Sequence, residues 1–327
     1  MSTNSLLFDG VDEFVQIGDV AALQFERTNS FSISAWVQRP SGGTHTIVAK
    51  EDTSAGGYRG YNVYVDTSNR IVFELISSFS TNLAQVRTRL GYVTNSTWRQ
   101  VVVTYDGSST AAGLKIYVDG VERPTDTIYD TLSATILSTA NFRIARRDDA
   151  SALFWNGYID EVAVYDKQLS AAEVLSLHTS LRLPVDHASV GPTANLVGYW
   201  RMGEGATFPT IPDDSTNAND GTMTNMEVGD ITATVTTGVT AQDIGVFEEV
   251  LGIVVVPSEA FQVREVINFL ETGGSGGGTS YFRMRGLADP GPGYVSWTVT
   301  GSPDFLGAFA PSAVQGSSVV TVVSWVE

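Results

Sequence analysis

The stretch that decides the fold is residues 156–174, NGYIDEVAVYDKQLSAAEV, where a strand pattern gives way to the start of a helix. Its first half is rich in β-branched and aromatic residues, a composition typical of strands. In its second half, Ser170 and Glu173 have the spacing of a capping box, in which each side chain bonds the backbone amide of the other. Leu169 and Val174 occupy the positions of a hydrophobic staple. The stretch therefore predicts a strand followed by a short helix.

Upstream of this stretch, one predicted strand follows another. In FSISAWVQ (31–38), alternation places every second residue from Phe31 to Val37 on one face of a half-buried strand. Asp119-Gly120 predicts a two-residue hairpin turn, because both central positions of that turn need a positive φ. Further strands are predicted at YNVYVD (61–66), IVFELIS (71–77), RQVVVTYDG (99–107) and LKIYVDGVE (114–122). Closely spaced strands with few helices indicate a β-sandwich or jelly roll.

The composition excludes several classes of function. The chain has 327 residues, with 36 acidic and 19 basic side chains and a formal charge of −17. Since binding to phosphate-rich partners needs basic patches, we expect no nucleic-acid binding and no attraction to anionic membranes. The absence of cysteine excludes disulfides, thiolate metal sites and cysteine nucleophiles. The chain has three histidines, His45, His178 and His187, and they lie far apart in the sequence. This scarcity disfavours imidazole zinc sites and serine–histidine catalysis.

The sequence also bears on membrane insertion and export. No stretch approaches the roughly 20 consecutive apolar residues that span a bilayer, so we expect no membrane insertion. The segment MSTNSLLFDG lacks the charged and apolar regions of a secretory signal, which predicts synthesis without one. A surface module made in this way is expected to be carried on a particle or released by lysis.

The strand motifs occur in a specific order along the chain. They are LLFDGVDEFVQIGD (6–19), FSISAWVQ (31–38), STWRQVVVTYDG (96–107), KIYVDGVE (115–122) and NGYIDEVAVYDKQLSAAEV (156–174). This series resembles the laminin-G-like jelly roll of the concanavalin A-like lectin/glucanase superfamily. The resemblance implies an all-β sandwich of two packed sheets.

One family motif is out of place. Members usually begin with a strand that resembles LVGYW, followed by GEG and an NDGT turn, whereas here LVGYWRMGEG…DDSTNANDGTMTN occupies 196–225. This order indicates a circular permutation, or else the start of a second, truncated copy. Permutation is physically reasonable because the termini of such sandwiches lie close together. Under permutation, residues 1–235 form one jelly roll, and 196–225 supply its displaced first strand.

Residues 180–195, which contain two prolines, are predicted to form a linker or surface excursion before the 196–225 motif, and residues 244–327 to form a smaller β-rich domain. FQVREVINFL (261–270) suits either a strand or a helix, and we favour a strand. SVVTVVSWV (318–326) is apolar on both faces, which indicates burial as a central strand or against another subunit. This domain is therefore expected to anchor the chain or to form a homo-oligomer. Its other strands are predicted at GIVVV (252–256), YFRMRG (281–286) and YVSWTVT (294–300).

The resemblance raises the question of catalysis, because the superfamily includes glucanases. Retaining glycosidases need two carboxylates about 5 Å apart. In the glucanase branch these carboxylates come from alternate positions of one strand. Asp160 and Glu161 are adjacent, so a regular strand would point them to opposite faces. We therefore predict that the protein is not an enzyme; a glycan hydrolase with a cryptic site is an alternative.

The resemblance also implies one calcium ion at a loop end, with Asp12 and Asp160 as ligands. Calcium takes six to eight oxygen ligands, which carboxylates supply. Asp9 is expected instead to bond backbone amides within its Asp-Gly turn.

Sugar binding relies on exposed aromatic rings with polar groups around them. The loop 51–61 offers Tyr58, Arg59 and Tyr61 as candidate sugar contacts. The segment RRDDASALFWN (146–156) offers Arg146, Arg147, Asp148 and Asp149. Trp155, in the same segment, is expected to fill the core, as most aromatic residues of a sandwich do.

Long β-rich chains without cysteine, and with polar turns, resemble the virion surface components of tailed bacteriophages, which often carry this jelly roll. We therefore predict a non-enzymatic structural and binding protein at the virion surface, as a capsid-decoration, head-fibre or tail-fibre protein. Its partners would be capsid or tail proteins, and its ligands host or environmental glycans. The alternative is an extracellular carbohydrate-binding lectin secreted by a bacterium.

Overall fold

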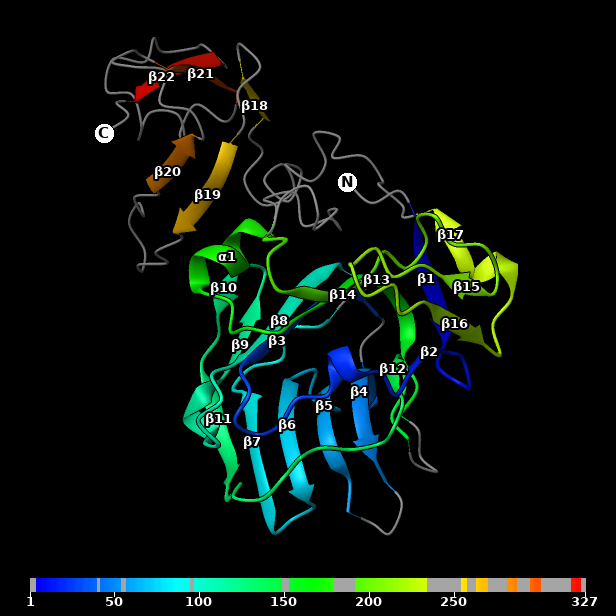
Figure 1. The fold of residues 1–327 in the computed structure, drawn as a ribbon. Coiled ribbons are helices and arrows are strands. Elements are labelled where there is room, and N and C mark those ends of the chain that lie inside the picture. The colour runs from blue at the N-terminus through cyan, green and yellow to red at the C-terminus, as the bar shows by residue number, and fades with distance from the viewer. Residues whose placement is uncertain are drawn as a thin grey trace. The chain divides into compact units, whose positions relative to one another are not determined.

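Two antiparallel sheets form the first part of the computed structural model (Figure 1), which confirms the predicted all-β sandwich. The structure describes residues 4–233 except 40–41, 54–56, 95–96, 149–152 and 179–191, and the backbone of five strands between 254 and 324. Contacts within the chain divide it into two compact units, Met1–Thr236 and Thr237–Glu327.

The eight-stranded sheet is built around two long central strands. It contains β1 (Asn4–Asp9), β3 (Phe31–Gln38), β8 (Arg99–Tyr105), β9 (Leu114–Val118), β10 (Val121–Glu122), β13 (Asn156–Tyr165), β14 (Leu196–Trp200) and β17 (Ile231–Ala233). The strands follow the order β10-β9-β8-β3-β13-β1-β17, and β14 also pairs with β13. Asp119 and Gly120 connect β9 to β10 with φ values of 54° and 75°, which confirms the predicted hairpin turn.

The nine-stranded sheet faces it across the core. It contains β2 (Phe14–Gly18), β4 (His45–Asp52), β5 (Arg59–Val65), β6 (Ile71–Ser78), β7 (Asn82–Thr88), β11 (Thr125–Asp130), β12 (Phe142–Ile144), β15 (Thr210–Ile211) and β16 (Gly221–Thr224). The strands follow the order β11-β7-β6-β5-β4-β12-β2-β16-β15. Short 3-10 turns lie in the connections: η1 (Ala21–Leu23), η3 (Ala111–Gly113) and η4 (Val228–Asp230).

The hydrophobic core lies between the two sheets. Every second residue of β3, from Phe31 to Val37, belongs to it, as the alternation predicts. Trp155 is fully buried, which confirms its expected place in the core. Trp200 is also fully buried and stacks on Phe142 at a ring-centroid distance of 5.5 Å. The displaced segment therefore contributes one of the largest side chains of the core.

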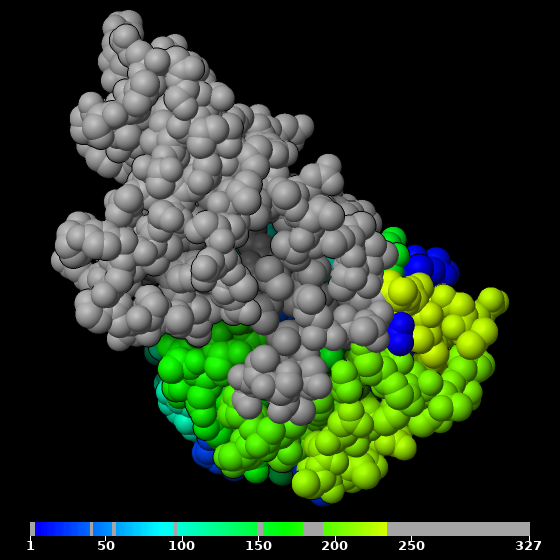
Figure 2. All heavy atoms as spheres, turned by 90° about the horizontal axis from the view of Figure 1, so that it is seen from above, coloured from blue at the N-terminus to red at the C-terminus, as the bar shows by residue number. Residues whose placement is uncertain are grey.

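Strand β13 has two neighbours on one side, placed end to end. β1 pairs with its first part, Leu6 opposite Ile159, and β14 pairs with its last part, Trp200 opposite Val162. Both run antiparallel to β13, so the end of β14 comes beside the start of β1. In Figure 2 the blue N-terminal atoms lie among the yellow-green atoms of residues 196–233. Strand β14 thus continues the edge of the sheet on which β1 lies, while circular permutation stays a prediction.

Helix α1 (Ala171–Ser176) follows β13, as predicted. Ser170 Oγ accepts the amide of Glu173, and the Glu173 carboxylate accepts the amide of Ser170, so the capping box is confirmed. Val174 is fully buried and packs with Tyr199 on the outward face of the eight-stranded sheet. The helices that the structure describes are too short to cross a membrane.

The second unit is described by its backbone strands. They are β18 (Val254–Pro257), β19 (Val263–Phe269), β20 (Tyr281–Gly286), β21 (Val295–Thr300) and β22 (Val319–Ser324). β18, β21 and β22 form one sheet in that order, and β19 pairs with β20. The ambiguous segment 261–270 thus contains a strand. Most of the predicted linker, and residues 318 and 325–326 of the apolar segment, fall outside the described residues, and oligomerisation stays a prediction.

Trp200→Ala is expected to destabilise the sandwich by about 3–5 kcal/mol, because it leaves a cavity in the core. The change also removes the hydrogen bond from the indole Nε1 to the Asn219 backbone oxygen, 3.0 Å long. Urea denaturation followed by far-ultraviolet circular dichroism measures the loss. Phe208→Ala is the matched control, since Phe208 lies in the same segment but is 43% exposed. A loss below about 1 kcal/mol for Trp200→Ala would contradict a core role for residues 196–225.

Candidate functional site

A row of polar side chains crosses the outward face of the nine-stranded sheet. Asn62, Glu74 and Gln85 lie opposite one another on β5, β6 and β7, and all are buried. The residues on either side of them along these strands include Val63, Phe73 and Val86, which belong to the core, so the row faces outward. Asn62 Nδ2 donates to Glu74 Oε1 at 3.1 Å, and Gln85 Nε2 donates to Oε2. Amide donors therefore fix the orientation of the carboxylate.

Burial changes the acid–base behaviour of this face. It raises the pKa of Glu74, while the amides of Gln85 and Asn62 and the charge of Arg147 act in the opposite direction. Burial also raises the pKa of the neighbouring Tyr64 phenol, because desolvation disfavours the charged form. The Tyr64 hydroxyl therefore keeps its proton at neutral pH and is able to donate a hydrogen bond.

Arg147, from the connection between β12 and β13, extends over this face. Its Nε lies 3.7 Å from Glu51 Oε1. Its guanidinium carbon lies 5.2 Å from the centre of the Tyr58 ring. A cation–ring contact of this kind contributes roughly 0.5–1 kcal/mol at an exposed site. Arg147 is thus held by a carboxylate and by an aromatic ring.

A hollow of about 250 Å³ opens beside the polar row. Its lining includes the hydrogen-bonding side chains of Tyr64, Gln85, Arg87 and Arg147, together with apolar atoms. Asp66, at the same hollow, lies 4.0 Å from the Arg87 guanidinium. A concave surface with a few convergent polar groups is the usual setting for a small polar ligand.

The sugar-contact residues predicted in the loop 51–61 are placed differently from one another. Tyr58 is half-buried, and its ring meets Phe79 at a centroid distance of 5.0 Å. Arg59 is exposed. Tyr61 is 2% exposed, and its hydroxyl donates to the Leu23 backbone oxygen at 3.0 Å. This corrects the prediction for Tyr61, because the alternation of β5 turns its ring into the core.

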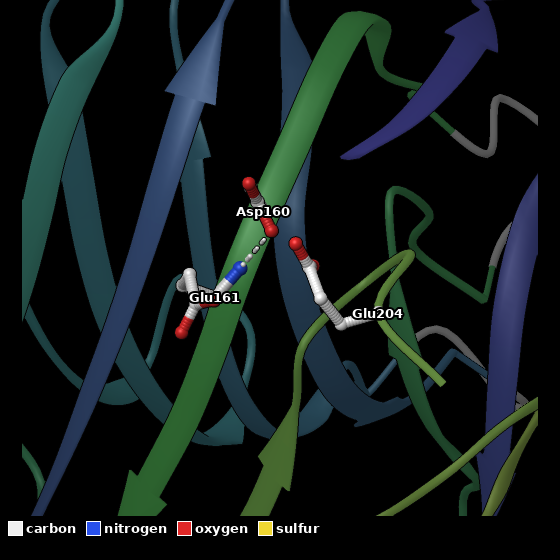
Figure 3. A group of neighbouring side chains, drawn as sticks. All are labelled: Asp160, Glu161 and Glu204. Carbon is white, nitrogen blue, oxygen red and sulfur yellow. Dashed lines mark hydrogen bonds between the residues drawn. The ribbon is translucent and has the colours of Figure 1, made fainter. Parts of the chain in front are cut away.

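A second group of acidic side chains lies on the eight-stranded sheet. Asp160 and Glu161 of β13 and Glu204, beyond β14, each offer a carboxylate oxygen within 4.8 Å of the others (Figure 3). Asp160 and Glu161 are fully buried, and Glu204 is half-buried. The Tyr199 hydroxyl donates to Glu161 Oε2, and Arg201 Nε lies 3.8 Å from Glu161 Oε1. The group carries more negative than positive charge.

This carboxylate cluster fits a hard divalent cation. Calcium binds oxygen ligands at about 2.3–2.6 Å, so two ligands of the same ion lie at most about 5 Å apart. The spacing in the cluster falls within that limit. The carboxylate cluster is therefore able to hold a metal ion.

Asp160 and Glu161 lie close together because β13 contains a β-bulge. Asp160 lies opposite Trp36 of β3, but Ala163 lies opposite Ser34, so β13 has one extra residue between them. Glu161 takes a φ of 49°, in the left-handed region. The expectation that the two carboxylates point to opposite faces is therefore wrong. Their adjacency does not exclude a carboxylate pair.

Asp12, the other predicted calcium ligand, is not part of the cluster found among the described residues. It is exposed in the turn between β1 and β2, and its backbone oxygen accepts from Asn225 Nδ2 at 3.2 Å. In the same turn, Asp9 Oδ1 accepts the amide of Val11 at 2.7 Å, which confirms the expected turn bond. The cluster thus joins Asp160 to Glu161 and Glu204 instead.

The family of the chain is established by the region that contains most of both sites. A family model described as the concanavalin A-like lectin/glucanases superfamily matches residues 9–175. The chain belongs to this superfamily. The predicted resemblance is thereby confirmed at the level of the superfamily, while an association with phage virions stays a prediction.

Three solved structures are similar to parts of this superfamily member. A candidate carbohydrate-binding protein from Bacteroides ovatus ATCC 8483 shares 17% identity over 69% of this chain and 59% of its own, with a TM-score of 0.49. The CBM40 of a Ruminococcus gnavus IT-sialidase, bound to α2,3-sialyllactose, shares 12% sequence identity over 53% of this chain and 97% of its own, with a TM-score of 0.41. A heptameric SAP-like pentraxin from Limulus polyphemus shares 11% sequence identity over 55% of this chain and 83% of its own, with a TM-score of 0.40. Likenesses at this level carry no argument about what this chain binds.

Several site residues lie outside the segments that the sequence singles out. Gln85 and Arg87 alternate with Ala84 and Val86 in NLAQVRT (82–88), a period-two signal that marks them as outward-facing. Glu204 gives no such signal, because only the pairing of β14 with β13 brings its segment beside Asp160.

Glu13, next to Asp12, is expected to make stability depend on pH. Burial raises the pKa of its carboxyl to about 7, and the negative charges of Asp230, Asp9 and Asp12 act in the same direction. The backbone amide of Asp9 donates to Glu13 Oε2 and acts in the opposite direction. The folded pKa exceeds the ordinary value of 4.5, so the native state binds this proton more tightly. The free energy of unfolding should therefore fall as pH rises from about 4.5 to about 7.

We expect this fall to be about 1–2 kcal/mol after allowance for solvent screening. Urea denaturation at a series of pH values across this range measures it. Glu13→Gln should remove this part of the pH dependence, whereas Glu122→Gln, at an exposed position on β10, should keep it. Equal pH dependence in the wild type and Glu13→Gln would contradict the prediction.

Proposed function

We propose that the chain is a non-enzymatic glycan-binding module whose ligand lies on the outward face of the nine-stranded sheet. The observation that carries the proposal is the buried row Asn62–Glu74–Gln85 beside a hollow lined by Arg87 and Arg147. Burying such groups costs free energy that an apolar face would avoid, so their presence suggests a use. Amides, carboxylates and guanidiniums are the groups that bond sugar hydroxyls. Membership of a superfamily that includes lectins supports the same class.

A glycan hydrolase is the second candidate, because the chain brings carboxylates together. Oxygens of Asp160 and Glu161 lie within 4.8 Å, close to the spacing of about 5 Å in retaining glycosidases. Both side chains are fully buried, however, and lie on the sheet opposite the polar row. On the polar face, both oxygens of Glu74 accept amide donors, which leaves this carboxylate poorly placed to act as a nucleophile. We therefore favour binding without bond cleavage.

A glycan array followed by isothermal titration calorimetry tests the proposal. Arg87→Ala and Gln85→Ala should each weaken binding about 10-fold, since each removes a polar contact at the hollow. Lys115→Ala is the matched control, because it removes a positive charge from β9 of the other sheet and should leave binding unchanged. The proposal fails if the wild type binds no glycan above background, or if both hollow variants bind as well as the control. Released reducing ends after incubation with the bound glycan would point to the hydrolase instead.

We also propose that this module is displayed on the virion of a tailed bacteriophage, as a capsid-decoration, head-fibre or tail-fibre protein. A cysteine-free, acidic, β-rich chain with a jelly roll and a second β-rich unit supports this setting. The second unit would attach the module to capsid or tail proteins, or assemble copies of it. A secreted bacterial lectin is the alternative. Stoichiometric copies in the mass spectrum of purified particles would support the virion, and their absence would count against it.

We further propose that the carboxylate cluster binds calcium and that the bound ion stabilises the sandwich. Asp160 lies on β13, Glu204 follows β14, and Glu204 Oε1 accepts the amide of Asn4 at 2.8 Å. An ion at this place would neutralise the clustered charge and tie three strands together. Its effect would be on stability, because the cluster lies on the sheet opposite the polar row.

Excess calcium is expected to raise the melting temperature by several degrees relative to chelator, since an ion at 100 times its Kd stabilises a fold by about 2.7 kcal/mol. Asp160→Asn and Glu204→Gln should abolish the shift. Asp12→Asn should keep it, which distinguishes the cluster from the exposed turn. Differential scanning calorimetry with and without calcium gives the measurement. Loss of the shift in Asp12→Asn alone would assign the ion to the turn.

A further inference from the structure

Tyr58 and Phe79 form a pair of aromatic rings at one end of the nine-stranded sheet. Their rings are tilted by 48°, with centroids 5.0 Å apart. Tyr58 lies in the β4–β5 connection and Phe79 in the β6–β7 turn, and both connections leave the same end of the sheet (Figure 1). The amide of Phe79 donates to the Gly57 backbone oxygen at 3.0 Å. Backbone bonding as well as ring contact therefore fixes the pair.

Phe79 is exposed at a turn that does not need an aromatic residue. Its side chain is 48% exposed, although the turn ISSFSTN (76–82) is otherwise made mostly of small polar residues. Such residues are sufficient for a tight turn. A lone exposed ring is ordinary on a protein surface. A second ring fixed against it, beside a polar face, makes a surface suited to stacking.

Arg147 connects this ring pair to the hollow. Its guanidinium carbon lies 5.2 Å from the centre of the Tyr58 ring. The same side chain lines the hollow together with Tyr64 and Arg87. One arginine side chain therefore lies between the two surfaces. The pairing of Tyr64 with Val72, and of Val72 with Arg87, places the hollow toward the other end of strands β5–β7, so a glycan must extend along this face to reach both.

The size of the hollow and the charge of the chain limit the length and the charge of the glycan that can bind. At about 250 Å³, the hollow is smaller than the roughly 300–1,000 Å³ of pockets that enclose drug-sized ligands, so it accommodates about one sugar unit. A longer glycan must find its remaining contacts on the adjacent surface. The formal charge of −17 opposes the approach of anionic glycans. Both arginines at the hollow already lie near a carboxylate, Arg87 near Asp66 at 4.0 Å and Arg147 near Glu51 at 3.7 Å, so the local charge also favours neutral glycans.

We propose that Tyr58 and Phe79 form a second subsite, which stacks a neutral pyranose of a glycan whose other end occupies the hollow. The inference rests on the proposed glycan-binding function. The C–H groups on one face of a pyranose pack against the exposed Phe79 ring, while Tyr58, supported by Arg147, bounds the same subsite. The ligand is then a neutral oligosaccharide of three or more units, and a monosaccharide fills the hollow alone.

Calorimetric titration of the full chain with neutral gluco- and galacto-saccharides, from mono- to tetrasaccharides, tests this subsite. Phe79→Ala should weaken binding of tri- and tetrasaccharides about 10-fold and leave binding of monosaccharides unchanged. Tyr58→Ala should weaken binding of saccharides of every length, because it also removes the ring that holds Arg147 at the hollow. Phe79→Leu keeps an apolar side chain without the ring and should lose as much, whereas Phe79→Trp should restore binding. Phe208→Ala is the matched control, because Phe208 is similarly exposed, at 43%, and lies outside the proposed site.

The outcomes separate the two proposals. Length-dependent loss in Phe79→Ala and Phe79→Leu, absent from the control, supports the second subsite. If the wild type binds oligosaccharides and Phe79→Leu binds them equally well, the subsite is overturned and glycan binding stands. A preference of the wild type for uronate- or sialate-containing chains overturns the neutral class. Failure of the wild type to bind any saccharide, neutral or acidic, overturns both proposals.

Discussion

The pairing of β13 with strands along both of its edges is the constraint on which the rest of the sandwich depends. β3 runs along one edge, while β1 and β14 share the other. Because these two strands meet end to end, the chain after β14 must leave the sheet beside the start of β1. Gly203 permits this close approach, since a Cβ there would lie 2.5 Å from the Cβ of Asn4. The same junction brings Glu204 to the bulge of β13.

The sequence predicts the elements whose signals are local or repeated along the chain. Alternation in residues 31–38 identifies the core face, and the spacing of Ser170 and Glu173 identifies the start of the helix. The motif at 196–225 indicates either a permuted first strand or a second, truncated copy, and it is the structure that places this segment in the first unit. The bulge at Glu161 is different, because one extra residue in a strand changes which face each side chain takes without altering the composition. The carboxylate cluster also depends on long-range pairing.

The two candidate sites use opposite sheets, and the core separates them. The polar row lies on β5, β6 and β7, whereas the carboxylate cluster joins β13 to the segment after β14. Groups that are well separated and share no partner contribute to stability almost additively. An ion at the carboxylate cluster would therefore change the stability of the sandwich, whereas a ligand at the polar row would bind to the other sheet of that sandwich.

The polar row also bears on how strongly a single module binds. Its amide–carboxylate bonds hold the side chains in place before a ligand arrives, which lowers the ordering cost of binding. The small hollow offers few contacts, however, so the affinity of one module for a short glycan is limited. Weak sites gain strength when many copies are held together, since later contacts become intramolecular. A proposed binding face of this size is therefore best used on a repeated scaffold, which is the role that we propose for the second unit.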